Sequence, residues 1–399
     1  MKNTFLTLAI ASMLLISCGE DDTSDIIINN TDNSTTSTTN NNTTGGGETD
    51  PDAVEKIDLV GSQTSDLTLE AKNEYTVKGP FIMEQGTTLT IEEGTTIKAL
   101  AAGSDVYIAI AQGAKIIAEG TKDKPIIMTS NSTTPKAGDW GGLIILGKAP
   151  INSVAEGTAT SEIGQLPYGG TDATDNSGTI RYVRVQYSGG KADGQSENNG
   201  FSFYGVGNGT TVEYIQMFEG LDDGVEFFGG TVNVNYVSVV NAGDDSIDWT
   251  EGYSGTITNA YVKHGADHDK AFECDGYNTD IGNNSNPIYF SAPTVSDVTI
   301  VGNGGSAMHL RAGTQGVFTN ILIENYEEAI KLDGDATDNP TGQGVVDDLL
   351  QIVDVTFTNV TVKMSNNTGF DFTEADLISG DGNGTGTDYD SWGAGWTVE

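Results

Sequence analysis

A repeat with a period near 22 residues is the sequence feature that most restricts the fold of this chain. Each copy contains a β segment of alternating character, a turn rich in Gly, Asp and Asn, and an apolar–polar–apolar triplet. The clearest copies begin at Val212, Val234 and Ile257, and none of them shows the 3.6-residue period of a helix. Weaker copies are expected to begin at Val295, Phe318 and Phe357.

Strands of three residues are not stable alone, so each must pair with the equivalent strand of the next copy. Stacking the copies in register gives a parallel β-helix, in which neighbouring coils lie about 4.8 Å apart. The outer residues of each triplet, such as Val225 and Phe227, then point into the core, and the middle residue points outward. Related segments at 87–98 and 114–130 carry the pattern towards the N-terminus. The repeat therefore predicts an all-β parallel β-helix solenoid over residues 53–399, with coils of about 22–23 residues.

Composition and charge exclude several classes of protein. The 52 glycines disfavour long helices, because Gly costs about 1 kcal/mol in a helix interior. The chain has 57 acidic and 18 basic residues, a formal net charge of −39. This charge excludes a nucleic-acid partner, since phosphates are bound by clustered Lys and Arg. Two cysteines cannot form a disulfide framework.

The first residues resemble the signal peptide of a bacterial lipoprotein. An apolar run from Phe5 to Ile16 has the length of a secretory core and is too short to span a bilayer. It leads into Leu15-Ile16-Ser17-Cys18, which resembles a lipobox. The resemblance implies cleavage of residues 1–17 and lipidation of Cys18, so that outer-membrane lipid becomes a partner of the chain.

The residues after Cys18 indicate where such a lipoprotein would be displayed. The acidic run Glu20-Asp21-Asp22 resembles the export signal of Bacteroidetes lipoproteins that reach the outer face of the outer membrane. Residues 29–44 consist of six Asn, seven Thr, two Ser and one Asp, a composition that cannot bury enough surface to order the chain. We therefore expect a lipidated Cys and a disordered tether over residues 18–52, with the body facing the cell exterior.

Seven stretches of the body share one family pattern: Glu119–Ile127, Trp140–Leu143, Pro167–Gly170, Tyr182–Val185, Gly207–Tyr214, Leu221–Gly230 and Gly243–Gly252. They resemble the right-handed β-helix lipoproteins of Bacteroidetes, a group of the pectin-lyase-like superfamily. The resemblance implies a right-handed parallel β-helix. It implies little about chemistry, because most members have no assigned activity.

The predicted register brings acidic side chains together at one corner of the coil. Asp222 should lie beside Asp244 and Asp267, and Asp223 should lie near Asp245. Like charges about 5 Å apart repel even at a high effective dielectric, so a counter-ion, a shared proton or a structural need must compensate. A second column of outward-facing residues should run beside them, formed by Glu226, Asp248, Glu273, His309, Lys331 and Asp371.

Three interpretations of this acidic corner remain open. The aspartates can bind Ca²⁺, a hard cation that takes about six to eight oxygen ligands, and the scarcity of Cys and His disfavours a softer metal. They can cap turns by accepting hydrogen bonds from backbone N–H groups, the commonest role of Asp in such turns. A pair of them can also catalyse glycosidic hydrolysis. The Ca²⁺ ligands would be Asp222, Asp223, Asp244, Asp245 and Asp267.

For catalysis, the chain loosely resembles the polygalacturonase-type hydrolases of the same superfamily. Those enzymes use an Asp on one coil, an Asp pair on the next, and His, Arg and Lys on later coils. This chain lacks their Gly-His-Gly and Arg-Ile-Lys motifs, and Arg311 and Lys331 fall on different coils. The residues that follow the order are Asp223, Asp244, Asp245, His309, Arg311 and Lys331.

Several further residues are candidates for binding or for the core. The aromatic rings of Tyr204, Phe228 and Tyr253 fall just after triplets, where they either stack on sugars or cover the coil edge. Together with the outward Glu226, Asp248 and Glu273, they are the candidate ligand-binding residues. His264 and His268 lack a zinc spacing, and Cys274 and Trp249 are expected in the core. Polar insertions at 147–178, 188–199, 275–293 and 333–350 are expected to border the acidic corner.

These features favour a non-catalytic surface module that holds an extended glycan along the β-helix, with Ca²⁺ as an aid. One alternative is a polysaccharide-degrading enzyme, a hydrolase or lyase, that uses the acidic face. A lyase is disfavoured because acidic groups repel a uronate substrate. A second alternative is an adhesin or an accessory subunit of an outer-membrane uptake complex.

Overall fold

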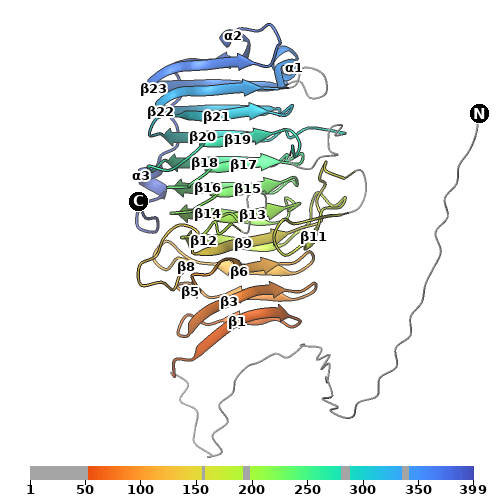
Figure 1. Cartoon of the computed structure of the whole chain (residues 1–399), viewed down its shortest axis with the longest axis vertical. Helices are drawn as coiled ribbons and strands as arrows, with labels where there is room; N and C mark the ends of the chain where they lie inside the picture. Colours follow the sequence, from red (N-terminus) through yellow and green to blue (C-terminus); the bar gives the residue numbers. More distant parts are fainter. Residues whose placement is uncertain (1–52, 155–157, 192–197, 280–287, 335–340) are drawn as a thin grey trace, which may run out of the picture. The chain divides into compact units, whose positions relative to one another are not determined.

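The structure is a computed structural model that describes residues 53–154, 158–191, 198–279, 288–334 and 341–399. The predicted signal peptide (1–17) and the lipidated Cys18 with its tether (18–52) lie outside these residues. Within them the coils are stacked one above another, from β1 to β23 (Figure 1).

The described body is a parallel β-helix, which confirms the predicted fold class. One sheet contains 22 strands, and its pairings are parallel, as between β14 and β16 and between β15 and β17. A separate antiparallel pair joins β10 to β11. The lower strands are β1 (Lys56–Gln63), β2 (Leu67–Leu69), β3 (Glu74–Met83), β4 (Thr88–Ile91), β5 (Thr96–Ala99), β6 (Gly103–Ile110), β7 (Lys115–Glu119), β8 (Ile126–Ser130), β9 (Trp140–Leu146), β10 (Ala159–Thr160) and β11 (Pro167–Tyr168).

Each upper coil has two sheet-forming segments joined by a corner turn. The first segment bends partway along, since residues 178–181 pair with β7 and residues 183–185 pair with β8, and the second segments form the next face. The upper strands are β12 (Gly178–Gln186), β13 (Phe201–Tyr204), β14 (Thr211–Phe218), β15 (Val225–Phe228), β16 (Asn233–Val240), β17 (Ile247–Thr250), β18 (Thr256–Lys263), β19 (Phe272–Asp275), β20 (Thr294–Val301), β21 (Ser306–Arg311), β22 (Gly316–Asp333), β23 (Leu350–Asn367) and β24 (Ile378–Ser379).

The register confirms the predicted starts of the copies, with one exception. Val212 pairs with Val234, and the same ladder continues through Ile257 and Val295 to Phe318. In the last coil the partner of Phe318 is Ile352, whereas Phe357 pairs with Ile323. The prediction that a copy starts at Phe357 is therefore wrong.

The same coil corrects the outward column. Lys331 pairs with Ser365, so Asp371 is not the next member of the column. The triplet Phe370-Asp371-Phe372 imitates the repeat but follows the end of β23, beside the short helix α2 (Glu374–Leu377). Its aromatic rings pack against the end of the core, which explains why the apolar–polar–apolar pattern misled the sequence prediction.

The core confirms the predicted direction of the triplets. Val225 and Phe227 are 0% and 1% exposed, and Trp249 and Cys274 are both 0% exposed. Fully burying one such side chain is worth about 1.5–3 kcal/mol. Aromatic rings stack along the coil axis inside the core, as between Phe203 and Phe227, whose centroids are 5.4 Å apart.

At one equivalent position of each upper coil, a non-glycine residue inside the first strand adopts a left-handed backbone conformation. These residues interrupt the pairing of β12, β14, β16, β18, β20, β22 and β23 at equivalent positions, since the ladder pairs only the residues on either side of them. Their φ values lie between 49° and 61°. We call this set the left-handed column: Tyr182, Tyr214, Tyr236, Asn259, Asp297, Asn320 and Asp354.

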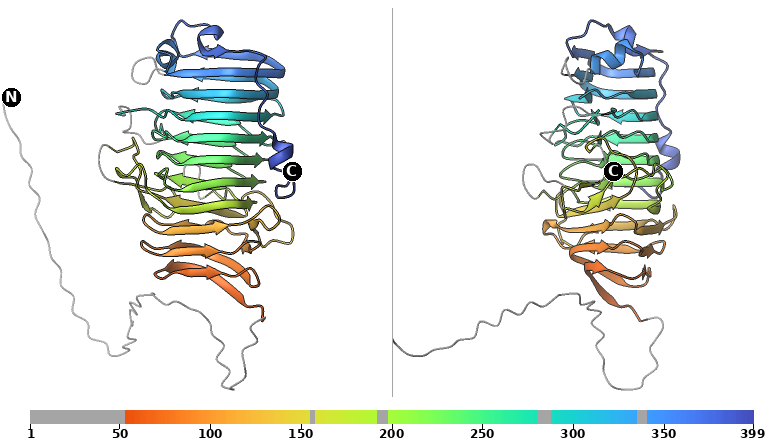
Figure 2. Two further views of the ribbon diagram at one scale, coloured as in Figure 1. Left: turned by 180° about the vertical axis from the view of Figure 1, so that it is seen from behind. Right: turned by 90° about the vertical axis from the view of Figure 1, so that its right-hand side faces the viewer.

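After β23 the chain forms α2 and β24 and then returns along the stack, so that helix α3 (Tyr389–Trp392) lies beside β16 and β18 (Figures 1 and 2). Helix α1 (Thr341–Val346) lies in the insertion between β22 and β23. None of the helices in the described residues is long and apolar enough to cross a membrane.

Candidate functional site

Eight acidic side chains converge where the corner turns lead into β15, β17 and β19, five of them in the turns and three in the strands. Stacking the turns places carboxylates of neighbouring coils in four overlapping groups of three, and the oxygens within each group lie within 4.8 Å of one another. Asp222 and Asp223 meet Asp244 in this way, as the predicted register required. We call the set the carboxylate cluster: Asp222, Asp223, Glu226, Asp244, Asp245, Asp248, Asp269 and Glu273.

Two members of the carboxylate cluster cap the turn of the next coil. The backbone N–H of Asp245 donates to Asp223 Oδ1 at 3.0 Å, and the backbone N–H of Lys270 donates to Asp245 Oδ1 at 2.6 Å. These bonds satisfy backbone donors that would otherwise be lost in the turn. Turn capping is therefore a real role of Asp223 and Asp245.

Basic side chains neutralise the two ends of the carboxylate cluster. Lys191 Nζ lies 2.9 Å from Asp222 Oδ1 and 3.6 Å from Asp244 Oδ2. Lys270 pairs with Asp269. At the upper end, the guanidinium of Arg311 lies 2.6 Å from Glu273 Oε2.

The middle of the carboxylate cluster has no such neutralisation. We call Asp223, Glu226 and Asp248 the central triad. Among the described residues, no basic group is within ion-pair distance of these three carboxylates. Glu226 accepts a hydrogen bond from Asn199 Nδ2 at 2.6 Å. Asp248 Oδ1 is buried and has no hydrogen-bond partner among the described residues.

Burial raises the pKa of every carboxyl in the central triad. For Asp223 the pKa lies well above its usual range because of burial first and the charges of Asp222 and Asp248 next. Burial also raises the pKa of Glu226, with Asp223 as the next cause. For Asp248 the pKa is raised by burial and then by the Glu226 carboxylate. Three carboxylates this close cannot all stay charged without a cation.

The predicted basic candidates lie on the same face, in a network of ion pairs above the triad. His309 lies between two carboxylates, with Nδ1 3.3 Å from Glu273 Oε1 and Nε2 2.7 Å from Asp333 Oδ2. Lys331 Nζ lies 2.7 Å from Asp333 Oδ2. His309 pairs with Lys331 in the ladder, as the outward column predicted.

Arg311 fixes the acidic residues at the base of this network. Its Nε donates to Asp275 Oδ1 at 2.6 Å. Burial raises the pKa of Asp275 to about 6, although Arg311 opposes the shift. Burial acts in the same direction on Glu273, but the hydrogen bond from His309 and the charge of Arg311 outweigh it and hold the pKa of Glu273 below its usual value.

Asp267 is not part of the carboxylate cluster, which corrects the predicted ligand set. Asp267 is exposed, and Asp269 occupies the position beside Asp244. The turn before β19 is longer than the turn before β17, because Ile247 pairs with Phe272, 25 residues on, whereas Val225 pairs with Ile247, 22 residues on. The extra residues move Asp267 out of register.

The aromatic candidates are buried, which favours the alternative that their rings cover the coil edge over the alternative that they stack on a sugar. Tyr204 and Phe228 are each 2% exposed and Tyr253 is 0% exposed. Tyr204 stacks on Phe228 at 3.9 Å, in a hydrophobic cluster that includes Ile151 and Tyr168 of the first insertion.

Tyr253 is held inside the main core. Its ring stacks on Phe227 at 4.3 Å, and its hydroxyl donates to the carbonyl oxygen of Val232 at 2.9 Å. Neighbouring coils therefore enclose the ring of Tyr253.

The two histidines before β19 do not form a metal site with the acidic residues. The groups of possible metal ligands found in the described residues contain no histidine. His264 is buried, and Tyr326 lies within hydrogen-bond distance of its Nδ1 at 3.0 Å. Burial lowers the pKa of His264 to about 3, and the neighbouring His268 ring, stacked at 4.2 Å, adds to the shift.

Glu251 is a buried carboxylate outside the carboxylate cluster that the sequence prediction missed. It follows β17 and is fully buried. Its carboxylate accepts hydrogen bonds from Ser153 and Tyr168 at 2.8 Å each, and from Asn278 at 3.1 Å. It thereby joins the insertions at 147–178 and 275–293 to one coil. A lone Glu before Gly252 was the sole sequence signal.

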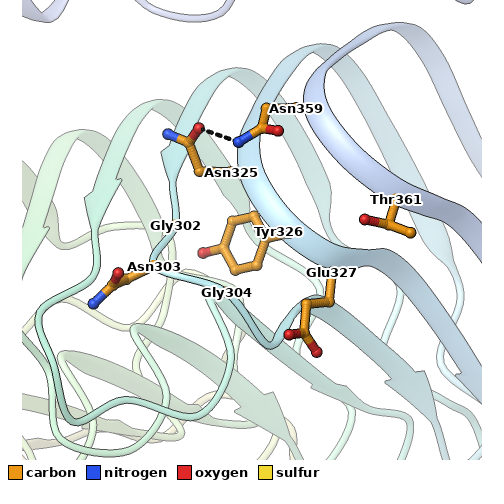
Figure 3. Close-up of a pocket in the computed structure, with 8 residues that line it drawn as sticks. All are labelled: Gly302, Asn303, Gly304, Asn325, Tyr326, Glu327, Asn359 and Thr361. Atoms are coloured by element: carbon orange, nitrogen blue, oxygen red, sulfur yellow. Dashed lines mark hydrogen bonds between the residues drawn. The ribbon is translucent and has the colours of Figure 1, made fainter.

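A polar hollow lies at the same corner of the coil, farther up the stack (Figure 3). It has a volume of about 510 Å³. The side-chain amide of Asn359 donates to Asn325 Oδ1 at 3.0 Å on its wall. Its lining offers amide, hydroxyl and carboxylate groups: Gly302, Asn303, Gly304, Asn325, Tyr326, Glu327, Asn359 and Thr361.

The fold and the corner define a β-helix protein with a carboxylate cluster on one edge. Residues 61–397 match the family described as the pectate-lyase like beta helix domain, and the chain belongs to this family. Its fold is also similar to the catalytic unit of a thermostable GH87 alpha-1,3-glucanase from Streptomyces thermodiastaticus strain HF3-3, with 11% identity and a TM-score of 0.38. That match covers 79% of this chain and 64% of the glucanase chain. No curated protein matches the chain.

The central triad predicts an unusual pH dependence in the absence of divalent cations. A carboxyl whose pKa is raised by folding holds its proton more tightly in the folded state. Its contribution to stability is complete below the ordinary value of 3.8 for Asp248 and is lost as the pH rises through the raised pKa. In chelator at neutral pH, the melting temperature of Asp248→Asn should therefore be higher than that of the wild type. Near pH 4 the two melting temperatures should be equal.

Thermal melts across this pH range measure the difference, with Asp267→Asn as the exposed control that should follow the wild type throughout. An Asp248→Asn variant that melts below the wild type at neutral pH in chelator would contradict the proposed charge repulsion.

Proposed function

We propose that the corner of the β-helix binds an extended neutral glycan, with Ca²⁺ held at the central triad. The observation that carries this proposal is the group of three carboxylates with oxygens within 4.8 Å of one another and no basic partner among the described residues. Either shared protons or a cation must relieve their repulsion. A cation does so without removing the charges that make the corner acidic.

The ligand chemistry of the central triad suits Ca²⁺. This ion prefers carboxylate and carbonyl oxygens and tolerates irregular geometry. Asp223, Glu226 and Asp248 supply carboxylates from adjacent coils. The residues of the carboxylate cluster include no thiol or imidazole, so a softer metal is disfavoured.

The neighbouring polar hollow supports a glycan as the ligand. Asn303, Asn325 and Asn359 line it, and amide groups both donate to and accept from sugar hydroxyls. The hollow lies on the same corner as the triad, between β20 and β23, and coils advance by about 4.8 Å. An extended polymer along the axis would contact both. The formal net charge of −39 favours a neutral chain over a uronate polymer.

Calcium should raise the melting temperature of the wild type. A ligand that binds only the folded state at a hundredfold excess over Kd adds about 2.7 kcal/mol of stability. Differential scanning calorimetry with Ca²⁺ and with chelator measures the shift. Asp248→Asn should lose the response, while Asp267→Asn, exposed and outside the carboxylate cluster, should retain it. If Ca²⁺ does not change the melting temperature of the wild type, the cation proposal is contradicted and turn capping is the role of the acidic corner.

A glycan array in Ca²⁺ and in chelator, with reducing-end release monitored, separates binding from hydrolysis. One observation favours hydrolysis as the second candidate: the short spacing and raised pKa values of the triad suit a carboxyl pair of a retaining glycosidase, typically about 5–5.5 Å apart. Glycan binding without release of reducing ends supports a non-catalytic binding module. Release that Glu226→Gln abolishes at unchanged stability would replace the binding proposal with an enzyme.

We further propose that Cys18 anchors the chain in the outer membrane with the body facing outward. The lipobox-like residues 15–18 and the acidic run after them support this. Display at the surface would also suit an adhesin or an uptake-complex subunit. Cys18→Ala should move the protein from the membrane to the soluble fraction, and protease added to intact cells should remove the wild-type body. Cleavage only after lysis would contradict surface display.

A further inference from the structure

The C-terminal segment lies along the left-handed column instead of joining the coils. We call residues 380–399 the strap. It runs from the last coil back to β12, and helix α3 is its middle part (Figures 1 and 2). The strap touches strands that are not neighbours in the stack. Repeat solenoids are otherwise stabilised by contacts between adjacent coils alone.

The upper part of the strap is held by polar side chains of the left-handed column. Asn320 accepts a hydrogen bond from the backbone N–H of Thr385 at 2.7 Å and donates to the carbonyl of Gly386 at 3.2 Å. Asn383 donates to Asp354 Oδ1 at 3.0 Å. The glycines are needed here, because a Cβ on Gly384 would lie 2.2 Å from the carbonyl oxygen of Ile321.

The middle of the strap is held by aromatic contacts. Tyr389 stacks on Tyr261 of β18 with ring centroids 3.7 Å apart. Its hydroxyl lies 3.2 Å from the hydroxyl of Ser238 in β16. Trp392 packs against Tyr236 at 5.5 Å. This part therefore joins two adjacent coils through side chains.

The lower part of the strap is buried against the tyrosines of the column. Tyr182, Tyr214 and Tyr236 form a stack with centroids 4.2–4.3 Å apart. Trp396 is 1% exposed and packs edge-on against Tyr182 at 5.4 Å. The side-chain amide of Gln216 forms two hydrogen bonds with Val398 near the chain end. It donates to the carbonyl of Val398 and accepts from its N–H, both at 2.8 Å.

We propose that the strap is a clasp that makes the coils from β12 to β23 unfold as one unit. Its contacts reach strands β12, β14, β16, β18, β20, β22 and β23. Any coil that opens inside this range must break the strap or bend it. The same coils carry the carboxylate cluster, whose like charges push neighbouring coils apart. The clasp does not depend on the proposed function.

Hydrogen exchange measured by mass spectrometry on the full chain tests the clasp, because it reports opening strand by strand. Trp396→Ala removes the contacts of the indole with Tyr182 of β12, with Tyr214 of β14 and with Trp392 inside the strap, and none of these touches β20 or β22. If the strap couples the coils, exchange should rise by about tenfold in distant β20 and β22 as well. Ser391→Ala, an exposed strap position, is the matched control and should leave exchange unchanged.

The reciprocal variant acts from the other end. Asn320→Ala removes the hydrogen bonds to Thr385 and Gly386 and should speed hydrogen exchange in β12. Gln216→Ala is the milder variant should Trp396→Ala fail to fold, with the same distant effect expected. Exchange that changes only in the strands next to each substitution would overturn the proposal and leave the strap as a local cover.

Discussion

Parallel pairing in register is the constraint on which the rest of this structure depends. Each coil hydrogen-bonds to the next one residue for one residue, so the side chain at a given position lies directly over its counterpart. Val225, Ile247, Phe272 and Met308 follow one another in this way inside the core. Side chains at equivalent positions of the repeat therefore form columns along the coil axis.

Stacking in such a column stabilises some side chains and destabilises others. Apolar residues and the Tyr182–Tyr214–Tyr236 stack gain contact area from it. Left-handed backbone at non-glycine residues costs about 1–2 kcal/mol each, and the ring stack and the strap offset that cost. Stacked carboxylates, in contrast, repel one another. The central triad is thus the place where the register works against stability, and a compensating cation or proton has to be present.

The sequence predicted what the repeat itself specifies. The direction of the triplets, the pairing of Glu226 with Asp248, and the meeting of Asp222 with Asp244 all follow from a constant spacing. The prediction failed where the spacing changes. A longer turn moved Asp269 into the place expected for Asp267, and a chance triplet around Asp371 imitated another copy.

Features made by segments without a repeat could not be predicted from periodicity. The insertion at 147–178 buries Tyr204 and Phe228, and Glu251 joins two insertions that lie far apart in the sequence. The strap is recognised by Asn320 at one end and by Gln216 at the other. Nothing in the spacing of these residues indicates that one segment contacts both.

Anomalous scattering from crystals soaked with a lanthanide tests the central claim most directly, because lanthanides replace Ca²⁺ at oxygen sites and scatter strongly. A cation at the central triad predicts an anomalous peak between Asp223, Glu226 and Asp248, absent from crystals of Asp248→Asn. A wild-type crystal at neutral pH with no peak there, and with carboxyl oxygens drawn together in short hydrogen bonds, would show that shared protons relieve the repulsion and would contradict the cation site.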